Sequence, residues 1–128
     1  MRTLLLALLG FCISGLAPAQ DFPARPVHLI VPYTPGTGAD ILARLLGPKL
    51  AERWKVAVVT ENKPGATGNI GTDFVAKAPP DGHTLLVVAT SFGTTPALNK
   101  NLPFDPVKSF EPVALVATSG VWNTSESS

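Results

Sequence analysis

The sequence has few of the side chains that build metal centres and covalent catalytic sites. Its 128 residues include one cysteine, Cys12, and only two histidines, His28 and His83, which are far apart in the chain. One cysteine cannot form a disulfide within the chain, and thiolate or histidine metal sites need several ligands. No serine or histidine stands in a recognisable nucleophile–base arrangement. We therefore expect no metal, no cofactor and no catalytic residue.

The sequence also lacks an excess of charge of one sign. It contains ten basic and nine acidic side chains. Binding to nucleic acid phosphates requires a basic surface, and electrostatic binding to an anionic membrane requires a cluster of basic residues. This balance argues against both kinds of partner, and no nucleic acid is expected.

A long apolar run occurs only at the N-terminus. Arg2 precedes the apolar stretch 3–16, and Ala17-Pro18-Ala19 then places small residues at both positions that an export peptidase reads. The run is shorter than the roughly 20 residues that span a bilayer. We predict that residues 1–19 are a signal peptide cleaved after Ala19, which would also remove Cys12. A short N-terminal membrane anchor is the alternative.

Strand and helix patterns alternate along the rest of the chain. Short β-branched or apolar runs predict strands at 27–31, 56–60 and 84–89. Helical periodicity between them predicts helices at 41–54 and 68–78. Buried strands joined by helical crossovers indicate an α/β fold with a parallel sheet.

Finer expectations concern the two helices. Pro48 lacks the N–H that would bond to the carbonyl of Arg44, so we expect a kink or break there. The large apolar side chains should face inward, namely Ile41, Leu42, Leu45, Leu46, Leu50 and Trp54 in the first helix and Ile70, Phe74, Val75 and Ala78 in the second.

The remainder of the chain has weaker signals. A polar loop is expected at 90–95, a short helix at 96–101 and an irregular stretch at 102–112. The apolar run 113–117 predicts a fourth short strand.

Two glycine-bearing loops lead from predicted strands into predicted helices. They span residues 33–40 and 62–69, with glycine at 36, 38, 65 and 68. Ligands of open α/β sheets bind beyond the carboxyl ends of the strands. Free N–H groups and the positive ends of the helix dipoles there suit an anion such as a carboxylate. Alternatively, the glycines only form tight turns.

Two phosphate-binding motifs do not match. A P-loop needs a Lys-Ser/Thr pair after its glycines, but Ala39 and Asp40 follow Gly38. A dinucleotide fingerprint needs a third glycine, where Ile41 stands.

Three polar residues in the predicted loops have two interpretations each. Asp40 could cap the helix start or orient a bound ligand. Ser91, in a third loop, could donate to a ligand or bond within its own loop. Tyr33 could form a wall of the binding site or only pack.

Several ordered segments resemble one known family. They are Arg25-Pro26-Val27, Ile30-Val31-Pro32-Tyr33, Pro35-Gly36-x-Gly38-x-Asp40, Glu61-Asn62-Lys63-Pro64-Gly65-Ala66-x-Gly68-Asn69-Ile70-Gly71, Asp81-Gly82-His83-Thr84-Leu85-Leu86 and Leu102-Pro103-Phe104-Asp105-Pro106. Together they resemble the Bug/TctC family, the periplasmic solute-binding receptors of tripartite tricarboxylate transporters.

The resemblance implies a two-lobed periplasmic receptor that closes on a small carboxylate, which is a di- or tricarboxylate or an acidic amino acid. Such receptors deliver the ligand to membrane permease subunits and are not enzymes. The ligand-binding residues implied by the resemblance are Tyr33, Gly36, Thr37, Gly38, Ala39, Asp40, Ala66, Thr67, Gly68, Asn69, Thr90, Ser91 and Phe92.

Compared with this family, the sequence is expected to hold only part of a receptor. Residues 20–119 correspond to the first part of lobe 1 of a periplasmic-binding-protein fold, with the second lobe missing. The tail 120–128 looks atypical and suggests a truncation or a frameshift. A receptor fragment with impaired binding is the first hypothesis. A non-functional exported remnant and, more remotely, an α/β enzyme are the alternatives.

Overall fold

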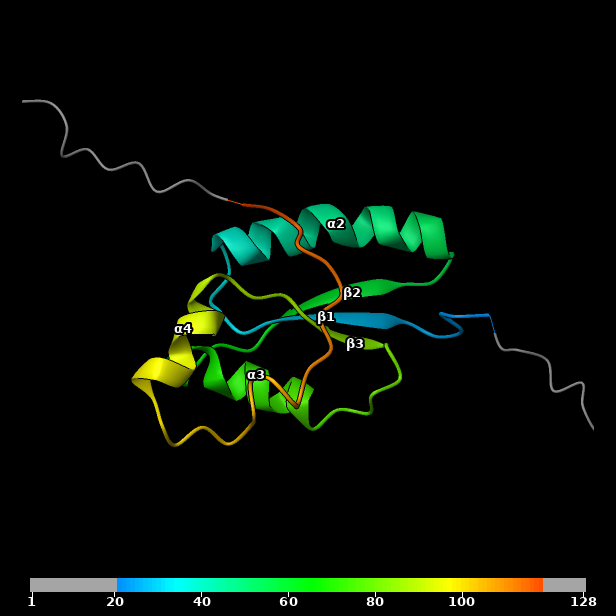
Figure 1. Ribbon diagram of the computed structural model, residues 1–128. Helices are drawn as coiled ribbons and strands as arrows, with labels where there is room; N and C mark the ends of the chain where they lie inside the picture. The colour runs from blue at the N-terminus through cyan, green and yellow to red at the C-terminus, as the bar shows by residue number, and fades with distance from the viewer. Residues whose placement is uncertain (1–20, 119–128) are drawn as a thin grey trace, which may run out of the picture.

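The protein is an α/β structure built on one small parallel sheet. The computed structural model describes residues 21–118, so the predicted signal peptide and the tail 120–128 lie outside the described residues. The strands are β1 (Val27–Val31), β2 (Val58–Asn62) and β3 (Thr84–Leu86), in the order β2-β1-β3 (Figure 1). The predicted α/β class and parallel sheet are confirmed.

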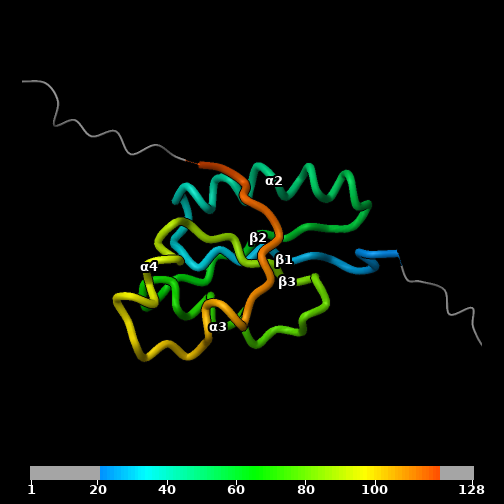
Figure 2. The backbone as a smooth tube through the Cα atoms, viewed as in Figure 1, coloured from blue at the N-terminus to red at the C-terminus, as the bar shows by residue number. Residues whose placement is uncertain are grey.

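One helix covers each face of the sheet. Helix α2 (Gly38–Trp54) connects β1 to β2, and helix α3 (Asn69–Ala76) follows β2. Figures 1 and 2 show α2 and α3 on opposite sides of the strands. Two helical layers around a parallel sheet explain why β1 is apolar on both of its faces.

The central strand β1 forms the core of the protein. Val27, Ile30 and Val31 are almost completely buried. Leu29 and Val31 pack with Ala39 and Ala43 of α2. Burying an aliphatic side chain of this kind contributes about 1.5–3 kcal/mol, so this strand supplies much of the driving force for folding.

Helix α2 faces the sheet with its smallest residues. The buried positions include Ala39, Ala43 and Gly47, four residues apart, whereas the predicted inward residues Ile41 and Leu45 are 52% and 61% exposed. A Cβ on Gly47 would lie only 3.6 Å from the Thr60 hydroxyl oxygen. The small residues therefore make the closest approach to the sheet. The prediction was wrong for Ile41 and Leu45, whereas the other predicted inward residues are half-buried, namely Leu42, Leu46, Leu50 and Trp54.

Helix α2 also differs from the prediction in its extent. It begins at Gly38 rather than at residue 41, and it continues through Pro48 to Trp54 without a break. Pro48 and Arg44 are both exposed. The carbonyl that Pro48 leaves unbonded therefore lies on the solvent side, where water can satisfy it.

Helix α3 repeats this pattern. Gly71 and Thr72 are buried, whereas the predicted inward residues Ile70 and Phe74 are 57% and 47% exposed. A Cβ on Gly71 would lie 2.6 Å from the Lys63 carbonyl oxygen. Gly71 thus lies against the chain where it leaves β1 and β2. The prediction was wrong for Ile70 and Phe74, whereas Val75 and Ala78 are half-buried.

The limits of the outer strands are set by pairing with β1. Strand β2 covers 58–62 rather than 56–60, with Val27 opposite Val58 and Val31 opposite Asn62. Strand β3 ends at Leu86, opposite Ile30, and not at residue 89. A strand can extend only as far as its neighbour offers hydrogen bonds.

Beyond the sheet the structure departs most from the prediction. Helix α4 (Ser91–Leu98) replaces the expected loop at 90–95 and the short helix at 96–101. Residues 113–117 have no regular secondary structure, and Leu115 is 82% exposed. Strand formation requires a partner, and 113–117 pairs with no strand within residues 21–118. None of the helices described is long and apolar enough to cross a membrane.

Candidate functional site

The predicted loops gather at one edge of the sheet. The carboxyl ends of the three parallel strands lie at the same edge, and α2, α3 and α4 all begin there (Figure 1). In open α/β sheets, this edge is where ligands bind. The fold therefore places the loop after each strand in the position that the sequence predicted.

Tyr33 contacts all three loops. Its hydroxyl oxygen lies 3.1 Å from Ser91 Oγ and accepts a hydrogen bond from the Ala89 N–H at 3.4 Å. A Cβ on Gly68 would lie 3.2 Å from the Tyr33 ring. The Asn62 side chain at the end of β2 donates to the Tyr33 carbonyl oxygen at 3.1 Å. Tyr33 thus links the three loops through hydrogen bonds as well as through packing of its ring.

The loop after β1 presents unpaired donors. Gly38, Ala39 and Asp40 are the first three residues of α2, and their N–H groups have no acceptor among residues 21–118. The Gly36 N–H, in contrast, donates to the Asp40 carboxylate at 2.9 Å. The free donors are therefore at the helix start, where the helix dipole also favours an anion, and Thr37 is the N-cap residue before them.

The loop after β2 has an unusual backbone. Four successive residues have positive φ: Gly65 at 126°, Ala66 at 47°, Thr67 at 56° and Gly68 at 93°. The short 3₁₀ helix η2 (Ala66–Gly68) lies within this run and leads into Asn69, the first residue of α3. Left-handed backbone at alanine and threonine is strained, and strain of this kind is concentrated at functional sites.

The third group, Thr90, Ser91 and Phe92, forms the start of α4. Ser91 reaches Tyr33, as described above, and its carbonyl oxygen accepts from Thr95 Oγ1 at 2.8 Å. The Phe92 ring packs edge-to-face on Phe110, with 5.6 Å between the ring centroids. Ser91 is therefore joined to the first loop, whereas the Phe92 side chain contacts the segment that follows α4.

Asp40 is buried and fully hydrogen-bonded, with an exposed fraction of 3%. Besides the Gly36 N–H, it accepts from Asn62 Nδ2 at 2.9 Å and from Arg44 Nε at 3.0 Å. The backbone N–H of Gly36, then Asn62 and Arg44, hold the pKa of Asp40 below its usual value. Of its two interpretations, the structure favours the structural one, although Asp40 bonds to the loop and not to the N–H groups at the start of α2.

The predicted ligand-binding residues did not include Arg44, and Asn62 was predicted only as the first residue of the loop 62–69. Arg44 follows Asp40 by four residues, the spacing at which helical side chains meet. Asn62 is the last residue of β2 and lies at the edge where ligands bind. These two signals could have identified both residues.

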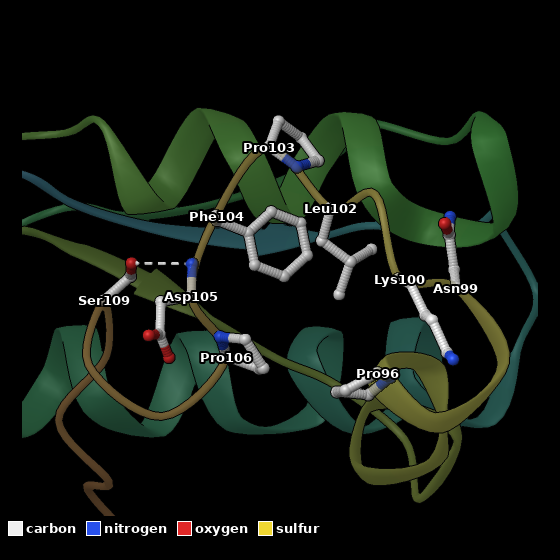
Figure 3. Close-up of a pocket in the computed structure, with 9 residues that line it drawn as sticks. All are labelled: Pro96, Asn99, Lys100, Leu102, Pro103, Phe104, Asp105, Pro106 and Ser109. Carbon is white, nitrogen blue, oxygen red and sulfur yellow. Dashed lines mark hydrogen bonds between the residues drawn. The ribbon is translucent and has the colours of Figure 1, made fainter.

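A separate open hollow is lined by other residues. It has a volume of about 570 Å³ and is formed by Pro96 and the segment 99–109. Figure 3 shows Leu102, Phe104 and Pro106 along it, beside the hydrogen bond from the Asp105 N–H to Ser109 Oγ. It contains none of the predicted ligand-binding residues. Within residues 21–118 no set of three potential metal-ligating side chains comes together.

The family described as the tripartite tricarboxylate transporter family receptor, TctC, matches residues 42–123. This chain belongs to the TctC family. A UPF0065 protein of Bordetella bronchiseptica is 41% identical over 117 residues, which are 90% of this chain and 35% of that protein. The chain thus spans about a third of the length of this relative.

Two solved structures of TctC-type proteins resemble the described fold. The periplasmic binding protein BugD is 44% identical with a TM-score of 0.67, and the match covers 71% of this chain and 30% of BugD. MatC from Rhodopseudomonas palustris, solved with bound malate, is 39% identical with a TM-score of 0.68, covering 74% and 33%. The α/β arrangement is therefore part of a periplasmic-binding-protein lobe, as the resemblance implied.

Proposed function

We propose that this chain provides carboxylate-binding loops of a periplasmic receptor for small carboxylates. The ligands would be di- or tricarboxylates or acidic amino acids, which the receptor would pass to the permease subunits of a tripartite transporter. The convergence of three loops on Tyr33, beside the unpaired N–H groups of Gly38 and Ala39, is the observation that carries this proposal. The malate bound to the related MatC supports the ligand class.

The chemistry of the loops fits a carboxylate. Backbone N–H groups at the start of α2 donate hydrogen bonds to an anion, and the helix dipole adds favourable charge. Gly38 has open space beside its Cα, because no atom of a residue beyond its immediate surroundings lies within 4 Å of the position that a Cβ would take. A ligand oxygen can therefore approach this part of the backbone without meeting a side chain.

The proposed role is binding without catalysis. The site offers hydrogen-bond donors, which are sufficient to hold a ligand. A receptor needs no nucleophile or general base, because it only binds and releases its ligand. Export would depend on residues 1–19 as a cleavable signal peptide, a prediction that remains separate from the fold.

A matched pair of variants tests the site. Gly38 is the first helical residue, a position where proline is favoured. Thr37 before it is extended, with φ −71° and ψ 159°, which is the conformation required of a residue that precedes a proline. A proline at position 38 should therefore be tolerated. Gly38→Pro removes the N–H, whereas Gly38→Ala adds a side chain and keeps it. We expect Gly38→Pro to bind malate about tenfold more weakly than Gly38→Ala, because a hydrogen bond to a charged group is lost.

The measurement is an NMR titration of the ¹⁵N-labelled full chain with malate, which also detects millimolar affinity. We expect weak binding, because the chain spans about a third of its relative's length, and a two-lobed receptor encloses its ligand from both sides. The shifts should be largest at Gly38 and Ala39. Malate-induced shifts elsewhere only, or equal affinities of the two variants, would disprove the proposed site.

The alternative, an exported remnant without binding activity, is favoured by one observation. Val107, Val113 and Leu115 are each about 80% exposed, and exposed apolar residues of this kind promote aggregation. Thermal unfolding of the full chain separates the two hypotheses. A cooperative transition whose midpoint temperature rises with malate supports the receptor, whereas a gradual transition that malate does not change supports the remnant.

A further inference from the structure

Three side chains behind the loop after β1 form a closed network. Arg44 Nε donates to both carboxylate oxygens of Asp40, at 3.0 and 3.2 Å. Arg44 Nη2 donates to Asn62 Oδ1 at 2.8 Å, and Asn62 Nδ2 donates to Asp40 Oδ1 at 2.9 Å. Each residue of the network therefore bonds to the other two.

The network holds the loop at two backbone atoms. Asp40 Oδ2 accepts from the Gly36 N–H at 2.9 Å, and Asn62 Nδ2 donates to the Tyr33 carbonyl oxygen at 3.1 Å. Gly36 has φ of 89°, so the chain turns sharply where it is held. Both ends of the stretch 33–36 are thus fixed by side chains from outside it.

The network also changes the charge of the site. Asp40 is nearly inaccessible and lies at the start of α2, where the proposed ligand would place a second carboxylate. Two carboxylates close together repel each other. Arg44 pairs with Asp40 on one helical turn and cancels its charge. The low pKa of Asp40, due to Gly36, Asn62 and Arg44, keeps this carboxylate ionised at neutral pH. Its negative charge must therefore be neutralised if a carboxylate ligand is to bind beside it.

We infer that Asp40, Arg44 and Asn62 are positioning residues that fix the ligand-facing loop, and that Arg44 additionally makes the site tolerant of a dianionic ligand by neutralising Asp40. The neutralising role rests on the proposed function, whereas the fixing of the loop does not. The network thus deepens the proposed site by explaining how a buried carboxylate can lie beside a carboxylate ligand.

A direct contact between Arg44 and the ligand is the competing explanation. The Arg44 side chain is 53% exposed, but its Nε and Nη2 already donate to Asp40 and Asn62. The two explanations differ for a double variant. If Arg44 acts through the charge of Asp40, removing both charges together should restore much of the binding lost in Arg44→Gln, whereas a direct contact with the ligand would stay lost.

The ligand experiment is the malate titration of the full chain by NMR at neutral pH. We expect Arg44→Gln to weaken malate binding about tenfold, because it leaves the Asp40 charge uncompensated. Arg44→Lys, which keeps the charge, and the double variant Asp40→Asn/Arg44→Gln, which removes both charges, should each bind malate more tightly than Arg44→Gln but less tightly than the unmodified chain, because both lose part of the network that fixes the loop. Higher salt should reduce the difference in malate affinity between Arg44→Gln and the unmodified chain, since salt screens the repulsion between the two carboxylates. A double variant as weak as Arg44→Gln would overturn the neutralising role.

Lys77→Gln is the matched control. Lys77 pairs with Asp73 four residues earlier on α3, at 2.6 Å, so this variant also removes the basic member of a helical ion pair. It should leave malate affinity and its salt dependence unchanged. A loss equal to that of Arg44→Gln would show a general charge effect and would overturn the inference.

A second experiment needs no ligand. The Gly36 amide proton should change its chemical shift as Asp40 is protonated, with a midpoint below the ordinary pKa of an aspartate. Asp40→Asn should abolish this titration, and Asn62→Ala should shift the Gly36 resonance while leaving the fold intact. A Gly36 resonance that ignores pH, or one that titrates equally in Asp40→Asn, would overturn the positioning role.

The two experiments keep the hypotheses apart. If malate causes no shifts in the unmodified chain, the proposed function and the neutralising role fail together, and the Gly36 titration alone decides the positioning role. If malate binds at Gly38 and Ala39 while Arg44→Gln binds equally well, the proposed function stands and the neutralising role fails.

Discussion

The first and second parts of the described chain differ in how they are held. Residues 27–86 contain the three strands, both covering helices and every residue of the buried core. Residues 88–118 contain α4 and an irregular segment, and none of them is buried. In Figure 2 the later segment continues from α4 past α3 and then runs toward α2. Strong apolar sequence occurs in both parts, so hydrophobicity alone does not explain the difference.

The difference shows that a strand needs a partner in addition to a suitable sequence. The stretch 113–117 is as apolar as β1, yet Val113 is 78% exposed while Val27 and Val31 are completely buried. Strand β1 pairs on both sides, with β2 and β3. Hydrogen bonding to two neighbours and burial under two helices stabilise β1 in ways that 113–117 does not share within the described residues.

The largest effect should come from shortening a core side chain. Ile30 is 1% exposed and Leu98, in α4, is 86% exposed. We expect Ile30→Ala to lower the free energy of unfolding by about 3 kcal/mol and Leu98→Ala by less than about 0.5 kcal/mol. Urea unfolding followed by circular dichroism measures both, with Ile30→Val as a milder core change. Equal losses for Ile30→Ala and Leu98→Ala would remove the distinction between the two parts.

The next effect should come from adding one methyl group to a glycine. A Cβ on Gly71 would lie 2.9 Å from Pro32 Cα, whereas nothing lies within 4 Å of a Cβ on Gly93. We expect Gly71→Ala to destabilise by about 2 kcal/mol through overpacking. Gly93→Ala should be neutral or stabilise α4 by up to about 1 kcal/mol through helix propensity. Urea unfolding of both variants checks this, and a destabilising Gly93→Ala would show that α4 is packed more tightly than its exposure indicates.

A smaller effect should be visible without any substitution. Amide protons of β1 should exchange with solvent at least about tenfold more slowly than those of α4, because opening β1 requires the core to separate. Hydrogen exchange measured by NMR on the full chain tests this. Equal protection of β1 and α4 would mean that the chain unfolds as a single unit.

The smallest effect concerns pH. The pKa of Asp40 is lowered by Gly36, Asn62 and Arg44, and that of Asp105 by the N–H groups of Lys108 and Val107. In both cases folding favours the ionised form. The stabilisation is therefore present above the unfolded pKa of about 4 and is lost as the pH falls through the lowered value.

Because the two carboxylates lie in different parts, their variants should differ. Asp40→Asn should lower the unfolding midpoint at pH 7, and this difference from the unmodified chain should begin to shrink as the pH falls below about 4 and disappear once the pH is below the lowered pKa of Asp40. Asp105→Asn should change only the hydrogen exchange of 105–109, since that segment lies outside the core. A pH-independent loss for Asp40→Asn would mean that its effect does not arise from ionisation.

Local sequence patterns predicted the order of elements and the place of the site. The run 27–31 was predicted with its observed limits, and the loops after the strands were expected at one edge because parallel strands end together. The family segments pointed to a TctC receptor, which the match over residues 42–123 confirms. These predictions succeeded because periodicity, turn residues and motifs are local properties of the chain.

The sequence by itself thus determined the α/β class, the family and the loops at the carboxyl edge of the sheet. Only the tertiary structure decided that Ala43, Gly47 and Gly71 face the sheet, since the distance between layers selects small residues there. It also decided that Asp40 bonds to Gly36, Arg44 and Asn62, and that 113–117 is not a strand. Each of these outcomes depends on which distant groups come within contact distance, and a local pattern does not contain that information.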